Sequence, residues 1–166
     1  MTKRLARQDL IVVGIGSTLR GDDRVGLDLV RRVQEHFGGE LACLELSQPE
    51  VALAERLAGF DELLVVDAAV GQGDLPYTLV ELPVSDRLVP SGGLTSHVFD
   101  WGVILALSHR LYGGRARGRL LGVSATSFDL SEKLSEQCAR NAELAFSFLV
   151  DYCSRPGSSR GGDGAL

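Results

Sequence analysis

The chain has 166 residues, of which 45% are hydrophobic, so it is long enough and apolar enough to form one ordinary folded domain. Seventeen basic residues against 22 acidic residues give a net charge of −5, which argues against a protein that binds nucleic acid through its overall charge. No signal peptide and no apolar run of roughly 20 residues is visible, which argues against secretion and against a membrane-spanning helix.

The first half of the chain alternates between short apolar runs and segments of helical periodicity. The short runs are rich in Val, Ile and Leu, which is typical of strands buried in a parallel sheet. Between them, apolar residues recur three and four apart, and glycine or proline stands near the ends of these segments. The predicted elements are a strand at 9–13, a helix from 23 to about 37, a strand at 41–46, a short helix that opens at 47–49, and a strand at 62–66.

The second half continues the alternation after a strand of a different kind. The segment 77–83 alternates in polarity and ends in Pro83, which predicts an edge strand that can run antiparallel to its neighbour. Thr95 and Ser96 predict an N-terminal cap for the next helix. The remaining predicted elements are a loop at 84–93, a helix from 97 to about 112, a strand at 119–123 and a helix at 132–153.

This order of elements predicts the α/β class. We expect a three-layer α/β/α sandwich, with helices on both faces of a twisted, mostly parallel five-stranded sheet. Residues 1–154 are predicted to form this single domain, and residues 155–166 a disordered tail that can be removed without loss of stability. We expect a cytoplasmic monomer rather than a homo-oligomer, and its three widely spaced cysteines predict free thiols rather than a disulfide framework.

The glycine-rich turn at 14–23, GIGSTLRGDD, suggests a dinucleotide-binding loop at first sight. The dinucleotide fingerprint needs a third glycine where this chain has Leu19. Asp22 and Asp23 would also repel a pyrophosphate at the start of the following helix. We therefore expect no nucleotide cofactor, while the two acids are equally compatible with helix capping and with a functional site.

Ligands of parallel sheets bind outside the carboxyl ends of the strands, and three residues of metal-binding type are predicted there. Asp23 follows the first strand, Asp67 follows the strand at 62–66, and His97 begins the helix at 97–112. Two carboxylates and one imidazole match a metal site with open coordination positions. The segment 122–126 resembles a nucleophile elbow, but Thr126 stands where glycine is required.

Four segments of the chain together match the pattern of one known family. The most specific is VVGIGSTLRGDDRVGLDLV at 12–30. The others are VVDAAVGQGDLPYTLVEL at 65–82, TSHVFDWGVILAL at 95–107 and LLGVSATSFDLSEKLS at 120–135. These segments resemble the hydrogenase maturation endopeptidases, which process the large subunit of nickel–iron hydrogenases. The resemblance covers about residues 9–152, and it departs from the family pattern at Ser17, where Asn is usual, and at Arg24, where Gly is usual.

The resemblance implies an endopeptidase that removes the C-terminal extension of a hydrogenase large-subunit precursor after nickel insertion. Nickel supplied by the precursor would be recognised, and whether it polarises a carbonyl or activates a water stays open. The alternatives are a non-enzymatic, Rossmann-like metal- or nucleotide-binding module and another α/β hydrolase. The implied residues are Asp23, Asp67 and His97 as metal ligands, Asp23 and Asp22 as catalytic residues, and Gly14, Gly16 and Ser17 as substrate-binding residues.

Overall fold

The sheet has five strands in the order β2-β1-β3-β5-β4. The structure, a computed structural model, describes residues 5–85 and 96–157, and for residues 96–99 it describes the backbone alone. All neighbouring strands are parallel except β4, which pairs antiparallel with β5 at one edge, as predicted. The strands are β1 (Leu10–Ile15), β2 (Ala42–Leu46), β3 (Glu62–Ala69), β4 (Tyr77–Leu82) and β5 (Arg117–Ser124).

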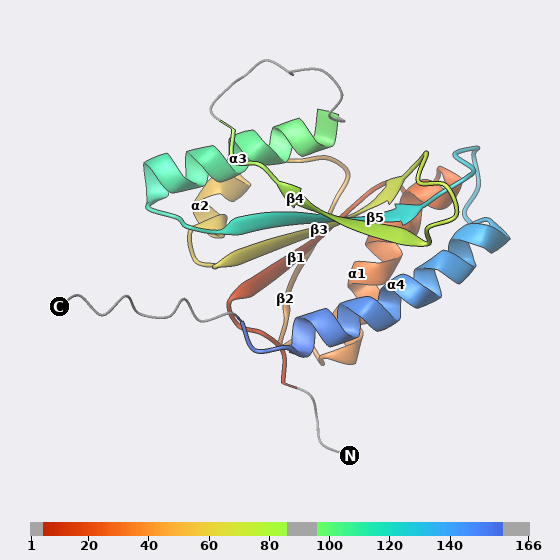
Figure 1. The fold of residues 1–166 in the computed structure, drawn as a ribbon, viewed down its shortest axis with the longest axis horizontal. Helices are drawn as coiled ribbons and strands as arrows, with labels where there is room; N and C mark the ends of the chain where they lie inside the picture. Colours follow the sequence, from red (N-terminus) through yellow and green to blue (C-terminus); the bar gives the residue numbers. More distant parts are fainter. Residues whose placement is uncertain (1–4, 86–95, 158–166) are drawn as a thin grey trace.

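Helices cover both faces of this sheet and complete the predicted three-layer sandwich (Figure 1). One face is covered by α1 (Val25–His36) and α4 (Glu136–Ser154), and the other by α2 (Leu53–Leu57) and α3 (Ser96–Tyr112). Each face has its own hydrophobic core, and alternate residues of β1 and β3 belong to the two cores. Burial on both faces therefore explains why these strands are unbroken apolar runs in the sequence.

Several predicted boundaries are wrong. The short helix predicted to open at 47–49 begins only at Leu53. A 3-10 turn, η1 (Gly21–Arg24), precedes α1, so the regular helix begins at Val25 rather than at Asp23. β3 continues through Asp67 to Ala69 because β5 pairs with it along this whole length, so Asp67 lies inside the strand. The last helix begins only after Ser135, whose hydroxyl accepts a hydrogen bond from the Cys138 N–H and caps it.

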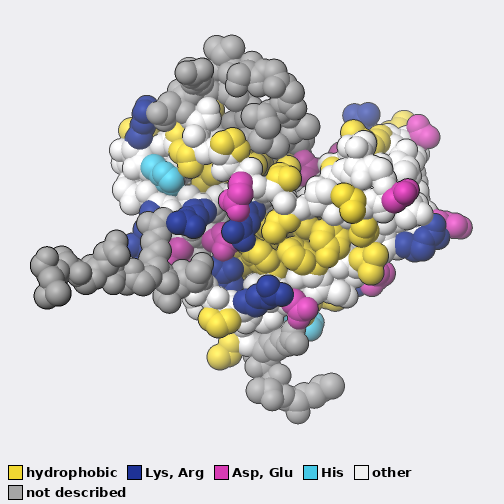
Figure 2. All heavy atoms as spheres, in the orientation of Figure 1, with side chains coloured by type: hydrophobic (Ala, Val, Ile, Leu, Met, Phe, Trp, Pro, Cys, Tyr) yellow, Lys and Arg dark blue, Asp and Glu magenta, His cyan; other side chains and the backbone are white. Residues whose placement is uncertain are grey.

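The surface over β4 and α4 is more apolar than the sequence suggests. Leu144, which helical spacing predicts to face inward, is 55% exposed. Figure 2 shows a patch of hydrophobic side chains on this face of the molecule. In the parts of the chain that the structure describes, no helix is both long and apolar enough to cross a membrane.

The chain continues past α4 through residues 155–157, and Gly157 lies directly against the carboxylate of Asp9. Residues 158–166, which make up most of the predicted tail, lie outside the described residues, as do the predicted cap at Thr95 and most of the loop at 84–93.

Glycine at position 26 allows the first turn of α1 to touch two strands. A Cβ atom added there would overlap the carbonyl oxygen of Val66 and lie 2.6 Å from that of Ile15. Because both obstacles are strand backbone, neither can move without disturbing the sheet. Close packing of α1 on β1 and β3 thus explains the glycine at position 26 of the segment 12–30.

We expect Gly26→Ala to destabilise the protein by about 1–3 kcal/mol, the usual cost of overpacking a tight interior. Gly59→Ala is the matched control, because an added Cβ there meets only the Arg56 carbonyl oxygen at an ordinary 3.5 Å. Urea unfolding of both variants measures the difference. Equal stability of the two variants would contradict the packing argument.

Candidate functional site

Two predicted ligands, Asp23 and Asp67, lie on neighbouring elements at the carboxyl end of the sheet. Asp23 belongs to η1, which contacts β3, and it is half-buried. Asp67 is 7% exposed, and its Oδ1 accepts a hydrogen bond from the Ala68 N–H at 2.8 Å. Gly26, three residues after Asp23, lies against Val66, the residue before Asp67. The close packing of α1 on β3 therefore brings the two acids to the same part of the molecule.

The first turn of α3 reaches the same level of the sheet. Leu105 of α3 packs against Gly118 of β5, and α3 runs opposite to β5 because it ends where β5 begins. His97 lies eight residues back from Leu105, or about 12 Å along a helix. Gly122 lies four residues on from Gly118, or about 13 Å along a strand. Since Gly122 is in register with Asp67, the backbone of His97 lies level with Asp67.

The side chain of His97 lies outside the described residues, so the predicted metal site is described in part. Among the side chains that the structure does describe, no three His, Cys, Asp or Glu residues are grouped so that they could hold a metal ion. The described site thus offers the two carboxylates of Asp23 and Asp67. Oxygen donors of this kind, joined by an imidazole, suit a divalent transition metal such as nickel.

Asp22 differs from its neighbour Asp23, because its carboxylate is fully buried and fully hydrogen-bonded. Its Oδ2 accepts N–H bonds from Thr126 at 2.9 Å and from Ser127 at 3.0 Å. Ser135 donates its N–H to Oδ1 at 2.7 Å and its hydroxyl to Oδ2 at 2.8 Å. Burial raises the pKa of Asp22, but the hydrogen bonds outweigh burial and lower it overall. This geometry gives Asp22 a structural role, and the catalytic role expected from the resemblance stays a prediction.

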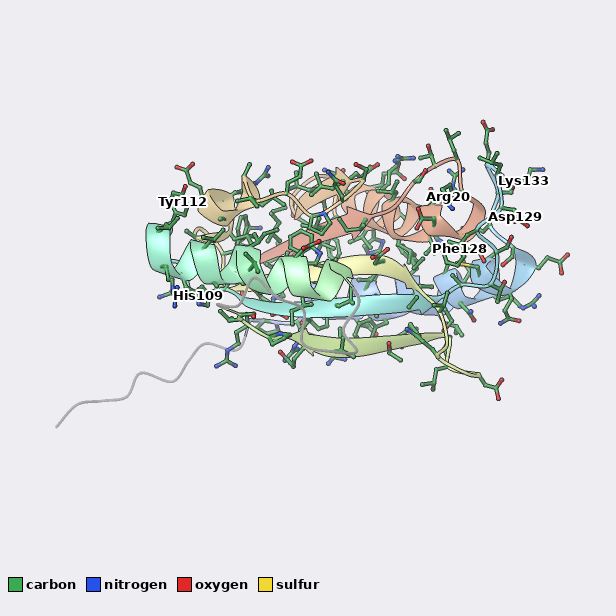
Figure 3. All side chains as sticks on the ribbon, turned by 90° about the horizontal axis from the view of Figure 1, so that it is seen from above. Arg20, His109, Tyr112, Phe128, Asp129 and Lys133 are labelled. Atoms are coloured by element: carbon green, nitrogen blue, oxygen red, sulfur yellow. The ribbon has the colours of Figure 1, made fainter. Side chains whose placement is uncertain are left out.

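The loop after β1 and the loop before α4 form one unit around Asp22. Arg20 and Ser131 pair as a parallel bridge, in which the Gly21 N–H donates to the Ser131 carbonyl at 2.8 Å. The Ser131 N–H donates in turn to the Leu19 carbonyl at 3.1 Å. Figure 3 shows Arg20 gathered with Phe128, Asp129 and Lys133 at this end of the molecule, and His109 and Tyr112 at the opposite end. Both loops therefore border the end of the sheet that carries Asp23.

Two of the predicted substrate-binding residues, Gly14 and Gly16, shape the backbone around Asp23. Gly14 is buried, and a Cβ there would lie 2.5 Å from the Gly26 carbonyl oxygen, so a glycine is needed here for close packing. The substrate contact expected of Gly14 stays a prediction. Gly16 has a φ of +151°, and a Cβ there would overlap the carbonyl oxygen of Asp23. The Ser17 N–H donates to that same oxygen at 3.3 Å. These contacts fix the position of Asp23, while a substrate contact of Ser17 stays a prediction.

The backbone N–H groups of this turn are largely engaged within the protein. A phosphate-binding loop instead directs several of its N–H groups toward the ligand. The N–H groups of this turn are therefore largely unavailable to a phosphate, and the absence of a nucleotide cofactor stays a prediction. The N–H donors and their carbonyl acceptors are Gly16 with Leu46, Ser17 with Asp23, Gly21 with Ser131, Asp22 with Ser127, and Asp23 with Arg20.

Solved structures of hydrogenase maturation proteases share this fold. The [NiFe] hydrogenase maturation protease HybD from Thermococcus kodakarensis is 18% identical with a TM-score of 0.64, covering 88% of this chain and 99% of that chain. The maturating endopeptidase HybD from E. coli is 18% identical with a TM-score of 0.65, and the match covers 87% of this chain and 91% of that chain. The [NiFe] hydrogenase maturation protease HycI from Thermococcus kodakarensis KOD1 is 21% identical with a TM-score of 0.64, and the match covers 88% of this chain and 92% of that chain. No protein-family model and no curated protein sequence matches the chain.

Proposed function

We propose that this chain is an endopeptidase that removes the C-terminal extension from the large-subunit precursor of a nickel–iron hydrogenase. The observation that supports the proposal is that this fold and a set of metal-binding residues occur together. The fold is that of solved hydrogenase maturation proteases, and Asp23, Asp67 and the first turn of α3 lie at one end of its sheet. The family-like segment 12–30 supports the same function, because its glycines and acids are the residues that shape this end.

In this proposal, Asp23, Asp67 and His97 hold the nickel that arrives with the precursor. Two carboxylate oxygens and one imidazole nitrogen leave coordination positions open, which the precursor's own ligands occupy. The metal is thus part of what is recognised, and it supplies the Lewis acidity for peptide hydrolysis at that place. The peptidase acts only when the precursor presents nickel, because neither the protein nor the precursor completes the coordination alone.

The surrounding residues keep these ligands in position before the substrate arrives. Gly16 and Ser17 fix the carbonyl of Asp23, and β3 holds Asp67 in register with β5. Asp22 ties η1 to the loop before α4. Preorganisation of this kind lowers the cost of assembling a metal site.

We also propose that the protein works in the cytoplasm. Cys43, Cys138 and Cys153 are free thiols, as the sequence predicts, and free thiols are typical of reducing compartments. Burial raises the pKa of Cys43 to about 11 and those of Cys138 and Cys153 to about 12. Such thiols are poor nucleophiles, so they fit a structural role and not a catalytic one.

Metal titration tests the proposed ligands directly. We expect the protein to bind Ni²⁺, or Cd²⁺ as a probe, and Asp67→Asn to weaken binding at least about tenfold, because the amide lacks the negative charge of the carboxylate. Asp74→Asn is the matched control, since Asp74 is an exposed acid in the connection between β3 and β4. Calorimetry gives both affinities, and an unchanged affinity in Asp67→Asn would contradict the assignment.

A further inference from the structure

A cavity of about 700 Å³ lies at the amino end of β3 and β5, beside the end of α4. It is therefore at the opposite end of the sheet from Asp23 and Asp67. The described residues that line it include five arginines but only three carboxylates, in a chain whose net charge is −5. We call it the arginine cavity, and its arginines are Arg7, Arg115, Arg117, Arg119 and Arg155.

Three of the arginines are neutralised by carboxylates. Arg7, only 9% exposed, pairs with Asp9 at 2.7 Å and with Glu62 at 2.8 Å. Arg115 pairs with Asp61 and Arg119 with Glu81, each at 2.7 Å.

Arg117 and Arg155 are the two cations of the cavity that keep their charge available. Both are exposed, and neither forms an ion pair with any side chain that the structure describes. All three carboxylates of the lining are already paired with other arginines. The arginine cavity therefore has two cations to offer to an external anion.

An apolar strip adjoins the arginine cavity on the same face of the sheet. The ring of Tyr77 packs on Phe148 at 5.2 Å, and Phe148 packs on Tyr152, which lines the cavity, at 5.5 Å. Leu79, 38% exposed, shares the face of β4 with Tyr77, and the exposed Leu144 lies one helical turn before Phe148. Figure 2 shows the hydrophobic patch directly beside the cluster of basic and acidic side chains.

The apolar strip leads from the arginine cavity toward the candidate site. In the β4–β5 register, Glu81 pairs with Arg119 and Tyr77 with Val123, so the strip spans four residues or about 13 Å. Its far end is one position from Gly122, which is in register with Asp67. β4 is also an edge strand, whose outer backbone groups can pair with an added strand.

We propose that the arginine cavity and the apolar strip form a docking surface for a segment of the precursor protein with acidic side chains at one end and apolar side chains beside them. The inference rests on the proposed function, because it takes the precursor as the partner. Arg117 and Arg155 receive the acidic groups, and Tyr77, Leu79 and Phe148 receive the apolar ones. In a two-fold dimer built on this surface, the unpaired arginines of one copy would face those of the other, so charge complementarity favours a segment with acidic side chains over a second copy of the chain.

Charge reversal tests the docking surface. We expect the double variant Arg117→Glu/Arg155→Glu, and separately Leu79→Ser, to raise the Kd for nickel-free precursor and the KM for nickel-loaded precursor about tenfold. The kcat should stay unchanged, because the surface is remote from the ligands. Arg56→Glu, a reversal at an exposed arginine of α2 on the opposite face, is the matched control. Circular dichroism confirms that each variant is folded.

The possible outcomes distinguish a failure of the docking surface from a failure of the proposed function. Unchanged Kd and KM in both surface variants, with normal processing by the wild type, would overturn the docking surface alone. A wild type that cuts no precursor would overturn the proposed function, while the Kd measurement would still decide on docking. A wild-type dimer that the double variant converts to a monomer, with no change in precursor affinity, would assign the surface to a second copy and overturn the inference.

Discussion

Asp67→Asn is expected to abolish processing of the nickel-loaded precursor, with a loss in rate of at least about 10³-fold. Asn preserves the volume of the side chain and can still accept the hydrogen bond from the Ala68 N–H, so the strand should remain intact. It removes the negative charge that strengthens the bond between a carboxylate oxygen and a divalent metal. The expected defect is therefore one of metal recognition in a folded protein.

The same loss is expected for Asp23→Asn and His97→Ala, because each removes one of three ligands. Conversion of precursor to mature subunit can be followed by its shift on a gel, with Asp74→Asn as the control that keeps activity. Circular dichroism and thermal melting show whether the variants are folded. Near-wild-type processing by any of the three variants would remove that residue from the proposed ligand set.

Asp22→Asn is expected to cost about 3 kcal/mol of folding stability, the largest effect that we expect for a polar substitution in this chain. The carboxylate accepts N–H bonds at both oxygens, so an amide nitrogen at either position faces a donor instead of an acceptor. At least one buried N–H is then left without its partner. Because Asp22 is next to Asp23, the affinity for nickel should fall together with stability.

Asp129→Asn provides the matched control for this prediction. Asp129 lies in the same loop before α4 but is exposed, so its variant should differ from wild type by less than about 0.5 kcal/mol. Urea unfolding measures both stabilities. If Asp22→Asn is as stable as Asp129→Asn, the network around Asp22 does not hold the two loops together.

The strands of the sheet could be predicted from the sequence because the residues within each strand indicate it. β1 and β3 are buried on both faces, and such strands appear as continuous apolar runs. The end of β3 could not be predicted in this way, because Asp67, Ala68 and Ala69 have little strand preference of their own. Their pairing with β5, some 55 residues later along the chain, extends the strand.

The residues that meet at this end of the sheet were also predictable, but the contacts that they make within the protein were only partly so. The rule that ligands bind at the carboxyl ends of strands places Asp23, Asp67 and the start of α3 together. Asp22 and Asp23 are adjacent acids, and no local sequence pattern indicates that their contacts differ. The partner that distinguishes Asp22 is Ser135, 113 residues further along the chain. Gly14 shows the same limitation, since its packing against Gly26 depends on how α1 docks on the sheet.

The most direct test of nickel-gated proteolysis compares one precursor with and without its nickel. The wild-type protein is incubated with each form, and the fraction converted to mature subunit is followed by gel shift over time. We expect complete conversion of the nickel-loaded precursor and none of the nickel-free form, because Asp23, Asp67 and His97 have nothing to bind in the latter. Efficient cutting of the nickel-free precursor would contradict the account and indicate a protease that recognises sequence alone.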